Sequence, residues 1–143
     1  MGQFLRTLSF VPADKLTWSP TPTAKSALQI AAHCAGYSSG FASIISAGKF
    51  PSDVQEFLDP IESAIEGIAT LEQAKTVLGK GIADTVAALD GVKPAQIGGT
   101  IDSPLGRQTP FLFFMNVPGV HLEAHAAQID YLQTCWDDQE VHL

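Results

Sequence analysis

Two histidines, His121 and His125, are spaced so that they could bind one metal ion. On an α-helix, a separation of four residues places both imidazoles on one face, one turn apart. Gln128 continues the same face. Pairs of histidines at this spacing also occur by chance on surfaces and in cores, so the metal interpretation requires a further ligand elsewhere in the chain.

Related chemistries that use the same residue types are excluded by the neighbouring residues. The zinc-protease motif needs a glutamate directly after the first histidine, where this chain has Leu122. Glu123 lies about 200° around the helix from His121 and points away from the metal face. A di-iron bundle needs a glutamate followed by a histidine three residues later, and no glutamate of the sequence meets this condition. The sequence also has no glycine-rich phosphate loop and no serine nucleophile elbow.

A further candidate ligand, His33, lies on a predicted helix that runs from Ser26 to about Ala47. Ser26 and Gln29 form the capping-box pattern that is typical of a helix start. The helix carries an apolar stripe at steps of three and four residues, formed by Ile30, His33, Tyr37, Phe41 and Ile44. His33 is therefore either a core histidine with one hydrogen-bond partner or a ligand directed into the interior.

Packing this helix beside the last one would bring His33, His121 and His125 toward one point. Three neutral imidazoles suit zinc or nickel, and also iron, and they leave at least one position open for water or substrate. An open position of this kind distinguishes a catalytic metal site from a structural one. Cys34 lies about 100° around the helix from His33, so we do not expect it to join the site. His142 lies near the C-terminus, where we expect a solvated side chain.

The remaining elements follow from apolar periodicity and from helix signals. Asn116 as the N-cap and Pro118 in the first turn begin the last helix. Gly36 and Gly40 would let a neighbouring helix approach the second one closely. Before residue 70 the sequence predicts a short helix over 2–10, an extended connection over 12–22, a short helix from 51 that Pro60 ends, and one or two helical turns over 61–68. A longer helix follows from Thr70 to about 90, with one apolar stripe formed by Leu71, Ala74, Leu78, Ile82, Val86 and Leu89. After it we expect a Gly- and Pro-rich loop over 91–108, which includes Asp102-Ser103-Pro104-Leu105-Gly106, and a buried helical turn or strand over 111–115.

Composition restricts the classes of function. The chain has 143 residues, enough for one domain with a real core, and 45% of them are hydrophobic. Eight basic and fifteen acidic residues give a net charge of −7 without a basic cluster, which disfavours nucleic-acid binding. No apolar run is long enough for a membrane span. The two cysteines are too few for a disulfide framework, so we expect a soluble, reduced, cytoplasmic protein.

Several segments, taken in order, resemble the DinB/YfiT-like superfamily. They are Pro12–Pro20, Ser26, Ala32-His33, and the set His121, His125, Gln128 and Tyr131 in the last helix. The resemblance spans essentially the whole chain. It implies a single all-α domain over 1–143, folded as a four-helix bundle of up-down-down-up type, with His33, His121 and His125 as metal ligands, and frequently a homodimer. The predicted first helix is shorter than is usual in the family, so we expect one edge of the bundle to be thin.

The resemblance also implies a type of chemistry. Members of known activity are thiol-dependent transferases and isomerases, in which the metal activates a low-molecular-weight thiol such as mycothiol or bacillithiol. It therefore implies a divalent-metal-dependent enzyme, of transferase or hydrolase type, that acts on a small-molecule or thiol substrate. The sequence shows no lysine or arginine cluster suited to a thiol cofactor's carboxylates. Two alternatives stay open, a non-catalytic metal-binding or stress-response module and a plain dimerising bundle with histidines in its core.

Overall fold

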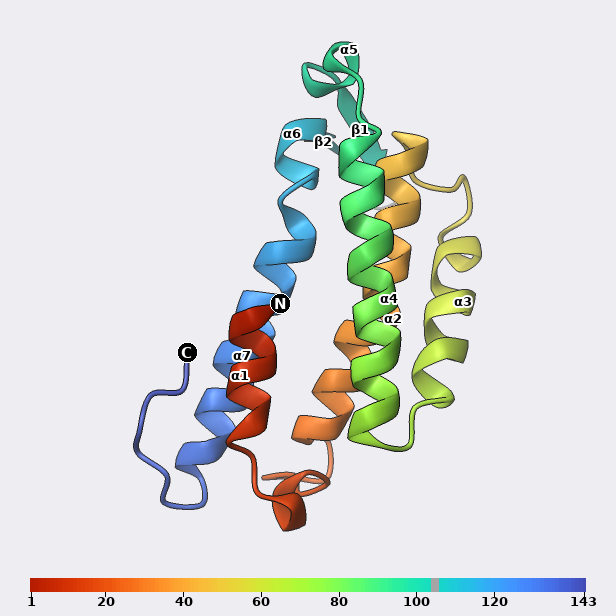
Figure 1. Ribbon diagram of the computed structural model, residues 1–143. Helices are drawn as coiled ribbons and strands as arrows, with labels where there is room; N and C mark the ends of the chain where they lie inside the picture. The colour runs from red at the N-terminus through yellow and green to blue at the C-terminus, as the bar shows by residue number, and fades with distance from the viewer. Residues whose placement is uncertain (104–105) are drawn as a thin grey trace.

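Helix α2 (Ala27–Ala47) is the central element of the fold. The long helices α3 (Val54–Glu66), α4 (Leu71–Asp90) and α7 (Val117–Thr134) pack against it. The structure is a computed structural model that describes residues 1–103 and 106–143, and it is mostly helical (Figure 1). The shorter elements are α1 (Gly2–Ser9), a 3₁₀ turn (Ala13–Lys15), α5 (Pro94–Ile97), β1 (Thr100–Ser103), β2 (Arg107–Pro110) and α6 (Phe111–Phe114). None of the helices in the described ranges combines the length and the apolar character that crossing a membrane requires.

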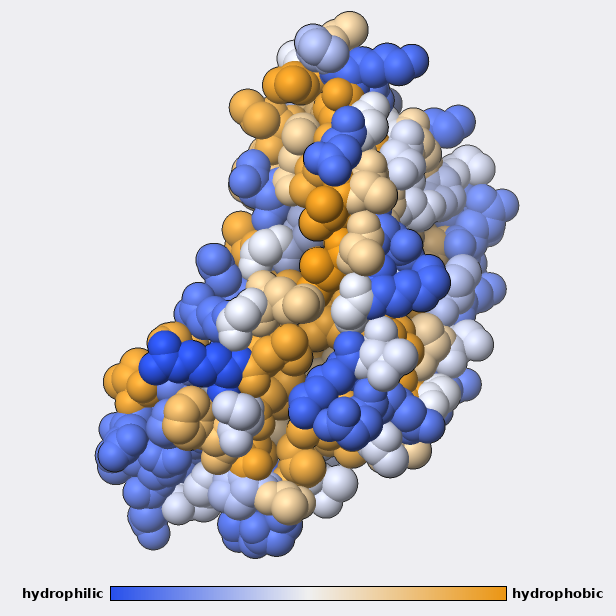
Figure 2. Space-filling view, in the orientation of Figure 1, coloured by the Kyte–Doolittle hydropathy of each residue, from blue (hydrophilic) through white to orange (hydrophobic). Residues whose placement is uncertain are grey.

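The long helices run along a common axis (Figure 1). Helix α4 runs parallel to α2, whereas α3 and α7 run in the opposite direction on other sides of it. Helix α1 lies along α7 and, at eight residues, covers only part of its length. Above α1, hydrophobic side chains gather between α4 and α7 (Figure 2), where a cavity of about 270 Å³ is lined in part by Met1, Ile82, Leu89 and Leu122. The bundle is therefore thin at this edge.

Both predicted capping boxes are present and set the starts of α2 and α4. The Ser26 hydroxyl accepts a hydrogen bond from the Gln29 amide, and the Gln29 side chain accepts one from the Ser26 amide. Thr70 and Gln73 make the same reciprocal pair at the start of α4. Each box satisfies backbone donors that the first helical turn leaves without partners. These short-range signals fix where the two parallel helices begin.

Glycines allow α3 and α4 to approach α2 closely. A Cβ atom on Gly81 of α4 would lie 2.5 Å from the Cβ of Ser38 on α2. A Cβ atom on Gly36 would lie 2.7 Å from the Ile65 side chain of α3, and one on Gly40 would lie 2.8 Å from Ile61. Real Cβ atoms do not come this close to other carbon atoms. The predicted close approach at Gly36 and Gly40 is confirmed, and α3 is the helix that makes it.

Two helix predictions require correction. Pro60 does not end a helix, because it lies inside the continuous helix α3. Phe57 and Ile61 on either side of it lie against the glycines of α2, so tertiary packing outweighs the loss of one helical hydrogen bond. Of the stripe predicted for α4, Ala74 and Leu78 are buried and Leu71, Ile82 and Leu89 pack against the core, but Val86 is 52% exposed. In its second half α4 instead buries the small residues Gly81, Thr85 and Ala88.

The predicted loop over 91–108 contains regular structure. After the short helix α5, strands β1 and β2 pair antiparallel, with Ile101 opposite Thr109. Pro104 and Leu105 of the predicted Asp102–Gly106 turn lie outside the described residues. Residues 111–114 form the short helix α6, which settles the alternative of helical turn or strand. Phe111 and Phe114 of α6 are buried in the cluster that also contains Phe41.

The two ends of α7 differ from the predictions. Asn116 stands at the N-cap position, but its side chain makes no cap and instead donates to the Leu112 carbonyl of the preceding turn. His142 is buried at 4% exposure, not solvated. Its ring stacks on Phe10 at 4.0 Å between centroids, and its Nε2 lies 2.9 Å from the Asp138 carboxylate. The chain after α7 therefore folds back onto α1, and the Thr7 hydroxyl donates to the His142 carbonyl.

Candidate metal centre

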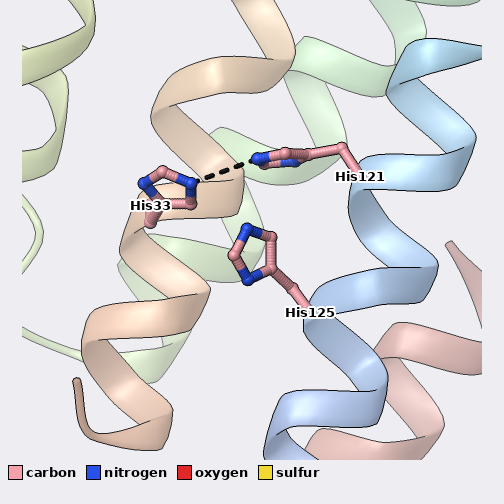
Figure 3. Close-up of side chains that lie close together, drawn as sticks. All are labelled: His33, His121 and His125. Carbon is pink, nitrogen blue, oxygen red and sulfur yellow. Dashed lines mark hydrogen bonds between the residues drawn. The ribbon is translucent and has the colours of Figure 1, made fainter. Parts of the chain in front are cut away.

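The structure brings His33, His121 and His125 together between α2 and α7 (Figure 3). One ring nitrogen from each residue lies within 4.8 Å of the other two. Helix α7 presents His121 and His125 on one face, one turn apart, and the antiparallel helix α2 places His33 opposite them. All three side chains are partly buried. The prediction that the three rings converge is confirmed.

The spacing of the nitrogens is compatible with a shared metal ion. The Nε2 atoms of His33 and His121 lie 3.1 Å apart. Two nitrogens bound to one tetrahedral ion at about 2.0–2.1 Å would be separated by roughly 3.3–3.4 Å. A shift of a few tenths of an ångström would therefore convert the contact between the two rings into joint ligation. The same contact in the metal-free protein is a hydrogen bond, in which one Nε2–H donates to the other Nε2.

Gln128 orients the ring of His125. The Gln128 Oε1 atom lies 2.7 Å from the His125 Nδ1 atom. An amide oxygen is only an acceptor, so Nδ1 carries the proton and donates it, which leaves a lone pair on Nε2. Figure 3 shows the outer nitrogen of His125 directed toward the space between the other two rings. This arrangement is typical of metal-bound histidines, whose second nitrogen is usually held by a partner that fixes the tautomer.

Burial keeps two of the three imidazoles neutral. Desolvation, with smaller contributions from His125 and Lys25, lowers the pKa of His33 to about 4. Desolvation, with smaller contributions from His125 and His33, lowers the pKa of His121 to about 4 as well. At neutral pH both rings are therefore uncharged, and the neutral imidazole is the form that binds metal. Two neighbouring imidazoles that stay neutral are chemically suited to a cation.

Aromatic side chains cover one side of the cluster. The Tyr37 ring lies 4.5 Å from the His33 ring and 5.6 Å from the His121 ring, measured between centroids. Phe41 meets His121 edge-on at 5.2 Å. These rings belong to the predicted apolar stripe of α2 and restrict the rotamers of the histidines. Cys34 stays out of the site, because it is fully buried in the core and burial raises the pKa of its thiol to about 12.

A cleft of about 670 Å³ opens beside the cluster, and its volume lies in the range of small-molecule sites. His33, His125 and Gln128 form part of its wall. The other lining residues come from the connection before α2 and from the two helices: Pro20, Thr23, Ala24, Lys25, Ile30, Ala124, Ala127, Tyr131 and Leu132. The contribution of Thr23 to Lys25 could not be predicted from the sequence, because no short-range signal places that connection beside α7.

The donor set therefore fits a divalent transition metal: three imidazoles, two kept neutral by burial and the third held by a partner, beside a cleft that could admit another ligand. The fold and the site together define a helical-bundle protein with a three-histidine cluster compatible with metal binding. Residues 2–129 match the DinB superfamily, and the chain belongs to that superfamily.

A similar solved structure is a DinB-like protein from Bacillus subtilis, with a TM-score of 0.64 and 17% sequence identity. The match covers 99% of this chain and 94% of that one, so the likeness extends over the whole fold. No curated protein matches this chain. At this level of identity the comparison establishes the fold alone.

Proposed function

We propose that the protein binds one divalent transition metal ion through His33, His121 and His125, and that this ion serves a transferase or hydrolase reaction. The observation that carries the proposal is the convergence of three ring nitrogens within 4.8 Å. The Gln128 contact supports it, because a surface pair of histidines would not need a fixed tautomer. Zinc and nickel suit an all-imidazole site best, and iron is also compatible with it.

Each residue of the site has a distinct role in this proposal. His33 and His121 are uncharged at neutral pH, so the ring that donates in their hydrogen bond needs only to move its proton from Nε2 to Nδ1. Gln128 holds His125 in the tautomer that faces the other two rings. Tyr37 packs against the cluster and keeps water from that side. When bound, the ion would supply Lewis acidity that lowers the pKa of a water or thiol, and the cleft would hold the second substrate.

The remaining expectations from the resemblance belong to the same proposal. The arrangement in Figure 1 supports treating α1, α2, α4 and α7 as the four helices of an up-down-down-up bundle, with α3 as the crossing segment between the two parallel helices. We also propose a homodimer, a cytoplasmic location and a small-molecule or thiol substrate. The exposed side chains of Val86 and Phe113 are surface that a second subunit could cover.

Metal content tests the proposal directly. Protein purified without a histidine tag and incubated with zinc or nickel should hold close to one equivalent after desalting. The His121→Ala variant should hold much less, because two ligands remain. The matched control is His142→Ala, which removes the fourth histidine of the chain at a place where it stacks on Phe10, outside the cluster. Less than about a tenth of an equivalent in the unaltered protein, with no affinity on titration, would refute the metal site.

Ligand exchange separates the catalytic role from the alternatives. In cobalt-substituted protein, a site with an open position should change its visible spectrum when azide, imidazole or a thiol is added. A bound ion whose spectrum does not respond would indicate a closed, structural site and a non-catalytic module. If metal has no effect and His121→Ala lowers stability only as a core truncation does, the protein is a plain helical bundle.

A further inference from the structure

The cleft beside the histidines has one charged feature in otherwise apolar surroundings. Its walls are formed largely by aliphatic and aromatic groups, including Ile30, Ala124, Ala127 and Leu132. Among the described residues that line it, Lys25 is the one with a permanent charge. Carboxylates outnumber basic groups by fifteen to eight in the chain, but none lines this cleft in the described ranges. The cleft is therefore apolar with a single positive end.

The charge of Lys25 is available to a ligand. Lys75 and Lys80 on α4 pair with Glu72 and Asp84, but Lys25 has no ion-pair partner within residues 1–103 and 106–143. Lys25 lies near the site, because it lines the same cleft as His33 and His125. An unpaired ammonium beside an apolar wall attracts an anion, whereas the net charge of −7 repels anions from the rest of the surface.

We propose that this cleft binds a small amphipathic monoanion, whose apolar body lies between α2 and α7 and whose anionic group pairs with Lys25. The proposal rests on the proposed function, since it names the class of substrate that the three-histidine site would act on. A single lysine fits one anionic group better than several. Lys25 is then a specificity-determining residue, which selects the ligand without taking part in the reaction.

The expected effects are modest and measurable. An exposed ion pair contributes up to about fivefold in affinity, so Lys25→Ala should weaken binding of the anion by about two- to fivefold. Lys25→Glu should weaken it further, by roughly tenfold or more, because like charges then face each other. Lengthening the apolar body should strengthen binding by about fourfold for each buried methylene group. The proposal requires both trends: the effect of the Lys25 substitutions tests the anionic end of the ligand, and the effect of chain length tests its apolar body.

The test uses a matched set of straight-chain probes on metal-free protein: hexanoate, octanoate, 1-octanol and octylamine. Binding is measured by amide chemical-shift changes in NMR titrations. Metal-free protein is used because a carboxylate could otherwise bind the ion directly. We expect octanoate to bind more tightly than hexanoate and 1-octanol, octylamine to bind least, and the shifts to centre on Ala124 and Ala127. Lys49→Ala is the matched control, because Lys49 is also exposed and unpaired but lies at the other end of α2.

Several outcomes would overturn the proposal. Equal affinity for octanoate and 1-octanol, an unchanged affinity in Lys25→Ala, or an equal loss in Lys49→Ala would each show that Lys25 does not select the ligand. Binding of no probe would refute the cleft as an amphipathic site. Metal uptake, measured on separate samples of the same variants after incubation with zinc or nickel, keeps the two proposals apart. Failure of the unaltered protein to take up metal refutes the proposed function, whereas the anion preference is determined without metal.

Discussion

Replacement of Gln128 by leucine tests whether a residue outside the ligand set controls metal affinity. Leucine keeps much of the side-chain volume but removes the oxygen that accepts from His125 Nδ1 at 2.7 Å. The imidazole can then take its other tautomer and rotate, so the population with Nε2 ready to bind falls. Loss of such an outer partner weakens metal binding by about 10–100-fold.

This loss can be converted into a thermal shift. At a free metal concentration 100 times the Kd of the unaltered protein, binding stabilises the fold by about 2.7 kcal/mol. At the same concentration, a tenfold weaker variant gains about 1.4 kcal/mol and a hundredfold weaker one about 0.4 kcal/mol. For a chain of this length, 1 kcal/mol corresponds to roughly 4 °C in Tm. The metal-induced shift should therefore fall from about 11 °C to between about 2 and 6 °C.

Competition titration with a chelator would measure the affinity, and differential scanning fluorimetry the shift in Tm. Gln128→Glu should retain most of the affinity, because a carboxylate also accepts from Nδ1. Glu123→Leu is the control for introducing leucine on α7, since Glu123 is exposed and points away from the cluster. If Gln128→Leu binds metal as tightly as the unaltered protein while His125→Ala does not bind, the Gln128 contact has no orienting role.

Three further predictions concern stability. Chemical denaturation should show that Gly81→Ala lowers the free energy of unfolding by about 1–3 kcal/mol, because the added Cβ would overlap α2. Gly79→Ala should raise the free energy of unfolding by about 0.5–1 kcal/mol, because its Cβ would meet nothing within 4 Å. A loss of stability in both variants would contradict the packing argument. In metal-free protein, His33 and His121 have pKa values of about 4, so these residues take up protons below about pH 6.5 in the unfolded chain but only near pH 4 in the folded protein. The free energy of unfolding should therefore keep its full value above about pH 6.5 and decrease toward pH 4. Denaturation across this range should show a flatter profile when both are replaced by glutamine, and an unchanged profile would refute the assignment. His142→Ala should lower the free energy of unfolding by about 1–3 kcal/mol and increase hydrogen exchange in α1, because the buried ring packs the C-terminal segment against that helix. Exchange in α1 at the rate of the unaltered protein would show that the C-terminal segment does not stabilise α1.

Short-range sequence patterns predicted the structure correctly where the interacting residues lie within one or two helical turns. The capping boxes at Ser26 and Thr70 fixed the starts of α2 and α4 because donor and acceptor lie only three residues apart. The spacing of His121 and His125 predicted their shared face for the same reason, since helical geometry is local. The position of His33 on an apolar stripe indicated that it faces a neighbouring helix, and that helix is α7.

Local patterns failed where a partner outside the pattern opposed them. Pro60 reads as a helix end, but α3 continues because its side chains fill the groove beside Gly36 and Gly40. The sequence predicts that the Asn116 side chain accepts a hydrogen bond as a helix cap, but this side chain instead donates to the Leu112 carbonyl of the preceding helix α6. The terminal position of His142 suggests a solvated ring, but Phe10 and Asp138 bury it. The decisive partners of Pro60 and His142 lie on distant segments, α2 and Phe10, whereas the partner of Asn116 lies four residues before it.

The sequence by itself determined that this protein is helical, where its main helices begin, and that His33 lies on an apolar stripe and His121 and His125 on one helix face, because those properties depend on residues within a few turns of one another. Only the tertiary structure decided that α2 and α7 lie antiparallel at a distance that brings the three ring nitrogens within 4.8 Å. It also decided that Lys25 lies at a cleft beside them. These features depend on how side chains from distant segments pack together, and periodicity within one helix carries no information about how far that helix lies from another segment.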